Sequence, residues 1–189
     1  MNRNLLIALT ASAALAAPFA AQAQSSAGST VVINGNVDKA CVIGQPTTVT
    51  LAIGNMTGSD GKITPALASA NEAVSTDIAG AWCNAPSTLS LDGAPMALSP
   101  VPAYSTPSGF ARLVTYDANL TGWSDPLLDR PLIGDAAKTV AAANAHASPL
   151  ELVISRLAAL DAAGTTENAA AVLEAGAYSG SVVVSVSVQ

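Results

Sequence analysis

The side chains best suited to acid–base chemistry are sparse in this sequence. His146 is the only histidine, and no nucleophile or carboxylate motif surrounds it. A positioned general base needs such a partner, so we interpret His146 as a solvated loop residue. The closest pair of acids, Asp125 and Asp129, flanks an apolar tripeptide that begins with proline. We interpret this pair as turn and surface residues rather than the acid and base of a glycosidase.

Motifs for other chemistry are also missing from the sequence. It contains neither a Gly-x-Ser-x-Gly elbow nor a phosphate-binding loop. The turn at Gly58–Gly61 includes one acid, Asp60, which is too few for a calcium loop. Cys41 and Cys83 each lack a second cysteine nearby, which argues against a metal centre. The sequence therefore predicts no catalytic residue, no metal and no cofactor.

The first 23 residues, Met1–Ala23, have the three parts of an export signal. Arg3 supplies the positive charge, Leu5–Ala17 is small and apolar, and Ala21–Ala23 has the small-x-small pattern of a cleavage site. The apolar run is shorter than the roughly 20 residues of a membrane span. We expect cleavage after Ala23, no membrane insertion, and a mature domain at 24–189.

Composition and cysteine usage fit one exported domain. The chain has 189 residues, 13 acidic and 7 basic, and 50% are hydrophobic. The negative balance argues against nucleic acid as a partner, and the high hydrophobic fraction argues against disorder. An even number of cysteines in an oxidising compartment predicts a disulfide between Cys41 and Cys83. The alternative is two buried free thiols.

Short apolar runs separated by turn residues predict an all-β fold. The expected strands are 31–33, 47–53, 88–91, 110–116, 150–157 and 181–188. Gly93–Gly109 contains four prolines and is expected to be a loop or edge segment. Asp135–Ala147 is expected to be a short helix or mobile loop, and Ala158–Ala171 a long turn. The few aromatic residues disfavour a membrane barrel, so a β-sandwich is expected.

The final run alternates most clearly. Val182, Val184, Val186 and Val188 share one face, which we expect to be the core face. No later segment follows this strand in the sequence, so its free edge is a candidate association site. The alternative is that an earlier strand already pairs with it.

Exposed aromatic residues suggest a different kind of site. Trp123 lies in a turn-like context and is the best candidate for a sugar-binding surface. The alternative, which we favour, is that Trp82 packs on the disulfide while Trp123 caps the sandwich, because aromatic rings contribute most when buried.

Three segments together carry a family resemblance. An N-terminal apolar segment, Val31–Val37, leads to Cys41–Ile43; Trp82-Cys83-Asn84 precedes a strand; and an Ala-Gly-x-Tyr element at 175–178 precedes the terminal strand. In this order the chain resembles the spore coat protein U domain, the pilin-like domain of archaic chaperone–usher systems. The likeness spans nearly the whole mature chain and is loosest in its middle.

The resemblance implies an immunoglobulin-like β-sandwich that lacks its final strand. It implies a structural subunit of a surface fibre or coat that supports adhesion or biofilm formation, with transit through the periplasm. The implied partners are a periplasmic chaperone, an outer-membrane usher and identical or related subunits. Val182, Val184, Val186 and Val188 would edge the acceptor groove, and the donor face would comprise Val31, Ile33, Gly35 and Val37. The alternative function is a monomeric secreted binding module, lectin-like or adhesin-like.

Overall fold

The computed structural model describes residues 32–44 and 52–189. The chain divides into two units, residues 1–36 and residues 37–189. Within the first unit only residues 32–36 are described, and these form neither helix nor strand. The predicted signal peptide Met1–Ala23, the donor residue Val31 and most of the expected strand at 47–53 lie outside the described residues.

The second unit is all-β, as the sequence predicts. Its elements are β1 Cys41–Val42, α1 Pro65–Ala68, β2 Val74–Ile78, β3 Trp82–Cys83, β4 Ser87–Ser99, β5 Phe110–Ala111, β6 Leu113–Thr121, β7 Leu127–Asp129, β8 Lys138–Ala142, β9 His146–Ala147, β10 Leu150–Ala159, β11 Val172–Leu173 and β12 Ala177–Val188. The helix α1 is one turn long and begins at an N-cap, Thr64. In the part of the chain that the structure describes, no helix is long and apolar enough to span a membrane.

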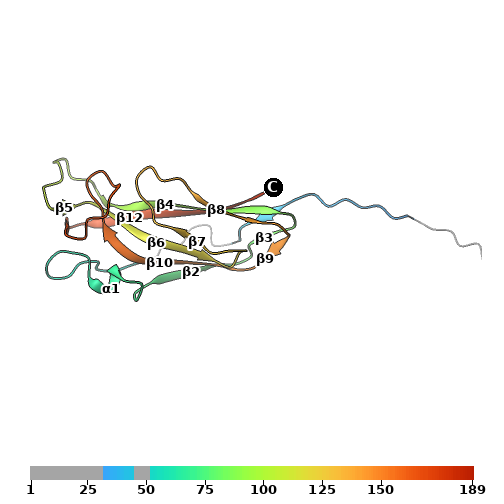
Figure 1. The fold of residues 1–189 in the computed structure, drawn as a ribbon, viewed down its shortest axis with the longest axis horizontal. Helices are drawn as coiled ribbons and strands as arrows, with labels where there is room; N and C mark the ends of the chain where they lie inside the picture. The colour runs from blue at the N-terminus through green and yellow to red at the C-terminus, as the bar shows by residue number, and fades with distance from the viewer. Residues whose placement is uncertain (1–31, 45–51) are drawn as a thin grey trace, which may run out of the picture. The chain divides into compact units, whose positions relative to one another are not determined.

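The strands form two layers that share β4 (Figure 1). In one layer β4 lies between β12 and β8, which both pair with it in antiparallel register. In the other layer β10 lies between β2 and β6, and β7 extends this layer beyond β6. The C-terminal half of β4 also pairs with β6 and joins the layers. This arrangement is the β-sandwich that the strand pattern predicts.

Strand β4 continues through Pro95, and Ala97 pairs with strands on both sides, so the expectation of a loop or edge segment from Gly93 onward is wrong for its first part. The pairing of β4 with β12 shifts between Ser179 and Ser181, at the point where Pro95 lies on the opposite strand. Proline lacks an N–H group, and a bulge is one place where a strand tolerates that loss. Gly180 faces this bulge, where a Cβ atom would lie 2.9 Å from the Cγ of Met96.

The core lies between the layers and consists mainly of aliphatic side chains. Leu89 and Leu91 from β4, Val114 from β6 and Leu150 from β10 are completely buried. Burying one such side chain stabilises the fold by about 1.5–3 kcal/mol. In β4 the completely buried Leu89 and Leu91 follow the period-two pattern of the sequence, with Ser90 between them on the other face.

Two small sheets close the ends of the sandwich. β1, β3 and β9 form a three-stranded sheet in which Cys41 and Cys83 are register partners and form the predicted disulfide. At the other end β5 pairs in parallel with β11. Figure 1 shows β5 and the β3–β9 pair at opposite ends of the sandwich.

The alanine-rich segment 135–147 contains β8 and β9, so the expectation of a helix or mobile loop is wrong. Alanine favours helices, but here the backbone pairs with β4 and β3, and Val140 packs on the core. Tertiary pairing overrides the local preference. The segment 158–171, in contrast, contains the expected turn, with Leu160 and Glu167 bridged across it.

Candidate strand-association edge

Strand β12 pairs with β4 along almost its whole length. An earlier strand therefore does pair with it, as one of the two sequence interpretations held. That pairing uses only one edge of β12. Within residues 32–44 and 52–189, no strand pairs with its other edge. Among the described strands β12 is therefore an edge strand, and its 12 residues are long for such a position.

The inward row of β12 is only partly covered. Val182, Val184 and Val186 pack against the core but remain half-buried. Their register partners on β4 include Leu89 and Leu91, which are completely buried. Val188, the fourth residue of the predicted groove edge, is exposed. The apolar surface of the core thus reaches solvent along this edge.

Strand β12 also lacks the features that usually protect an edge strand. Its sequence, Ala177–Val188, contains no charged residue and no proline. Natural proteins discourage strand addition with charges, prolines or short edge strands. The edge strand of the other layer, β2, is shorter and includes Asp77. Of these two edges, β12 is better suited to accept an added strand.

Two tyrosines hold the start of β12 in position. The Tyr116 hydroxyl donates to the carbonyl of Ala94 or of Ser181, at 2.8 and 3.0 Å, and so links β6 to both partner strands. Burial, and then the charge of Asp129, raises the pKa of Tyr116 to about 12.

The hydroxyl of Tyr178 lies 3.1 Å from the carbonyl oxygen of Ala111 and 2.9 Å from that of Glu174. Burial, and then the charge of Glu174, raises the pKa of Tyr178 to about 12. Both hydroxyls remain donors at neutral pH.

The end of β12 lies beside the segment that precedes β1. Gln189 donates its backbone N–H to the carbonyl of Pro86 and its side-chain amide to Ser87 and Thr88. The Lys39 ammonium donates to the Gln189 carbonyl oxygen at 2.7 Å. These contacts place the root of the N-terminal segment at the C-terminal end of β12.

The described part of the predicted donor segment is apolar and uncovered. The exposed fractions of Val32, Ile33 and Val37 are 72%, 91% and 83%. A Cβ atom on Gly35 would meet nothing within 4 Å. Exposed apolar side chains that lie close together mark a candidate interaction site.

The residues considered for chemistry and for sugar binding agree with expectation only in part: Trp123 is buried, as the favoured interpretation holds, but His146 is placed differently. His146 lies on β9, not in a loop, and its ring contacts Trp123 with centroids 4.6 Å apart. Trp123 is only 7% exposed, so it cannot supply the sugar-binding surface of the alternative interpretation. Trp82, in contrast, is exposed.

The two acids Asp125 and Asp129 also separate. Asp125 is exposed, as expected, but Asp129 is buried, which corrects its interpretation as a surface residue. One carboxylate oxygen of Asp129 accepts the N–H of Gly93 at 2.8 Å. Among the described residues, no group of three metal-ligating side chains comes together.

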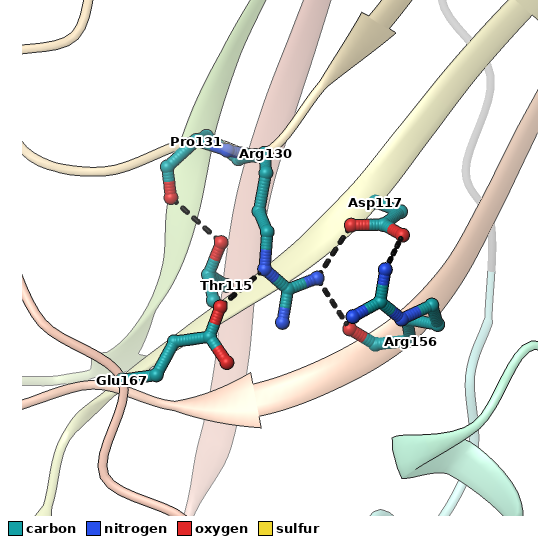
Figure 2. A network of polar contacts seen from close by, with 6 residues as sticks. All are labelled: Thr115, Asp117, Arg130, Pro131, Arg156 and Glu167. Atoms are coloured by element: carbon teal, nitrogen blue, oxygen red, sulfur yellow. Dashed lines mark hydrogen bonds and ion pairs between the residues drawn. The ribbon is translucent and has the colours of Figure 1, made fainter.

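A polar network that the sequence did not indicate covers the outer face of β6 (Figure 2). Asp117 accepts hydrogen bonds from Arg130 and Arg156, and Arg130 also donates to Glu167. Arg156 occupies a bulge of β10 with a positive φ of 49°, which turns its side chain toward Asp117. No local spacing pattern indicates this cluster, because its members come from different elements. The network links β6 to β10 and to the segments that carry Arg130 and Glu167.

Comparison with known proteins adds no relative. No protein-family model matches the chain, and no curated protein matches it. The assignment of a function therefore rests on the sequence and on the geometry of β12.

Proposed function

We propose that this protein is a structural, non-catalytic subunit of a surface fibre or coat that assembles by strand addition. The uncharged edge of β12, with its half-buried valine row, carries the proposal. An added strand would cover that row and satisfy the free backbone groups. The proposed occupant is the N-terminal segment of another copy, with Ile33, Gly35 and Val37 facing the groove.

The proposed donor segment and the edge strand β12 are both uncharged, so their association buries no charge. Residues 24–37 contain no charged side chain, and neither does β12. The resemblance to the spore coat protein U domain supports the same assembly route. In that route a periplasmic chaperone occupies the groove first, and an outer-membrane usher exchanges it for the next subunit.

Export is part of this proposal. A signal peptide at Met1–Ala23 would leave the donor segment at the mature N-terminus. Sequencing the N-terminus of the secreted protein tests this: we expect a start near Gln24. A start well beyond Ile33 would leave no donor segment and would contradict the proposal.

The strand face of each partner can be tested with neighbouring residues. In the donor, Ile33→Asp changes the proposed inward face and Val32→Asp changes the other face. In the acceptor, Val184→Lys changes the inward row, and Val183→Lys changes the exposed face of the same strand. We expect Ile33→Asp and Val184→Lys to abolish assembly measured by light scattering, while their neighbours still assemble.

A peptide of residues 24–38 separates strand addition from other association. It should raise the melting temperature of the full chain that carries Ile33→Asp, since the groove of that variant is intact. In the double variant Ile33→Asp and Val184→Lys, the peptide should not raise the melting temperature measured by circular dichroism. A wild-type chain that stays monomeric and is indifferent to the peptide would overturn the proposed function.

A further inference from the structure

Exposed apolar side chains gather at both ends of the sandwich. One group, here called the root end, consists of Val42, Trp82 and Val188. Val42 and Trp82 are register partners in the β1–β3 pair, so their side chains are neighbours. Val42 follows Val37, the last proposed donor residue, by five residues, and Lys39 contacts Gln189 next to Val188, so this group lies where the proposed donor segment joins the domain.

The other group, here called the loop end, consists of Val101, Tyr104 and Phe110. Val101 lies two residues after Ser99, the last residue of β4, and Phe110 begins β5. The register of β4 with β12 runs from Ser87 opposite Val188 to Ser99 opposite Ala177. Strands of this length separate the two ends by about 40 Å.

The proposed donor segment is joined to the domain without a flexible linker, because the residues that follow it are held by hydrogen bonds. The side chain of Asn84 accepts the N–H of Ala40 at 2.7 Å and donates to the carbonyl of Asp38 at 2.8 Å. Lys39, between them, contacts Gln189. The chain is thus held from Asp38 onward, directly after Val37, the last proposed donor residue. A donor paired with a neighbouring copy must bring its own domain against that neighbour.

Strand direction decides which end of the neighbour is met. The pairs on β12, β4 and β8 are antiparallel, and antiparallel pairing is slightly more stable per residue than parallel pairing. An antiparallel donor on β12 runs toward Ala177, so its domain arrives at the loop end. A parallel donor would run toward Val188 and bring two root ends together.

We propose that the root end of one copy packs against the loop end of the next, as a second interface between successive subunits. The proposal rests on the proposed function, and its partner is a second copy of this chain. Trp, Tyr and Phe side chains with an exposed apolar face are the types enriched at protein interfaces. This contact would set the angle between subunits, while strand addition connects them.

The test uses two full-length chains, one unable to accept a strand and the other unable to donate one, so that they form a dimer and no longer polymer. The donor chain carries Val184→Lys, and the acceptor chain carries Ile33→Asp. Adding Val101→Ser and Phe110→Ser to the acceptor should weaken its binding to the donor about tenfold in a titration. The same changes should leave the stabilisation by peptide 24–38 unchanged, because the peptide carries no domain. The matched control is Leu128→Ser, an exposed leucine on β7.

Trp82→Ser in the donor chain should weaken binding to a similar extent. A photo-crosslinker at position 101 of the acceptor should label the donor peptide that contains Trp82. Two results would overturn the second interface and leave strand addition intact. One is crosslinking between the root ends of the two chains. The other is unchanged binding for all variants at both ends, while the peptide still stabilises the acceptor chain. Loss of the peptide effect in the unmodified acceptor would instead overturn the proposed function.

Discussion

Asp117 belongs to the polar network on the outer sheet face, in which Arg130 makes the most hydrogen bonds. Asp117 is buried on β6 and accepts hydrogen bonds from two arginines, one of which reaches it from the bulge of β10. Such a carboxylate is costly to remove because its cationic partners then lose their counter-charge. Thr115, two residues earlier, is also buried and donates to the carbonyl of Pro131 at 2.7 Å.

Asp117→Asn tests this network. We expect it to lower the free energy of unfolding by about 2 kcal/mol, since Arg130 and Arg156 remain partly solvated and keep part of their hydration. The measurement is the midpoint of urea unfolding at neutral pH. Asp125→Asn, on an exposed acid, is the control and should leave the midpoint unchanged. Equal midpoints for both variants would contradict a stabilising role of the network.

The ion pair of Glu174 with Arg112 should make the stability of the fold depend on pH. The hydrogen bond from Arg112 lowers the pKa of Glu174 below the usual 4.5, and the Tyr104 hydroxyl adds a second donor. Because the folded pKa is depressed, the ion pair stabilises the fold fully above pH 4.5 and is lost as the pH falls through the folded pKa. The stability difference between wild type and Glu174→Gln, measured by urea unfolding, should shrink as the pH drops below about 4. A constant difference would contradict this assignment.

At the scale of elements, β12 combines two properties that are rarely found together. It is fixed at both ends, by Tyr116 and Tyr178 near its start and by Gln189 at its end. Its free edge nevertheless carries no charge. A rigid and unprotected edge is preorganised for an incoming strand, which reduces the ordering cost of association.

The disulfide joins β1 to β3 and so holds the root of the donor segment on the domain. Replacing Cys41 and Cys83 together by serine should destabilise the domain by about 4 kcal/mol in the chain-entropy model. Thermal unfolding of the double variant and of the reduced wild type should agree. A smaller effect from reduction alone would mean that the serine hydroxyls, rather than the lost crosslink, cause the destabilisation.

At the scale of the whole molecule, acidic residues outnumber basic ones, 13 to 7. Most of the basic residues take part in ion pairs: Arg112, Arg130, Lys138 and Arg156 each face a carboxylate. The remaining surface is therefore acidic, while the donor segment and β12 are neutral. Charge would keep the copies soluble without opposing the proposed contact.

Association should accordingly depend little on salt. Between about 50 and 500 mM sodium chloride, the dissociation constant of the donor and acceptor chains should change less than about threefold, because neutral surfaces release few counter-ions and screening removes only weak long-range repulsion. Isothermal titration at both concentrations measures this. A steep weakening with salt would indicate an electrostatic interface elsewhere on the domain.

Much of the fold was predictable because strands follow local chemistry. The alternation of valine and serine in 181–188 predicted β12, and two cysteines predicted the disulfide. Strand β8 was missed because its alanines are not typical of strands, and the strand around Pro95 was missed because proline usually ends one. In both places the partner strand, not the local sequence, supplies the reason for the structure.

The sequence by itself determined which segments alternate, which residues are apolar enough to form a core, and that the last strand carries no charge. Only the tertiary structure decided that β4 takes one edge of β12, that Asp129 and Trp123 are buried, and that Lys39, just before β1, lies beside Gln189. The physical reason is the distance along the chain between the residues that interact. Alternation reflects neighbours along the chain, whereas pairing, burial and the open edge depend on segments brought together by packing of the whole domain.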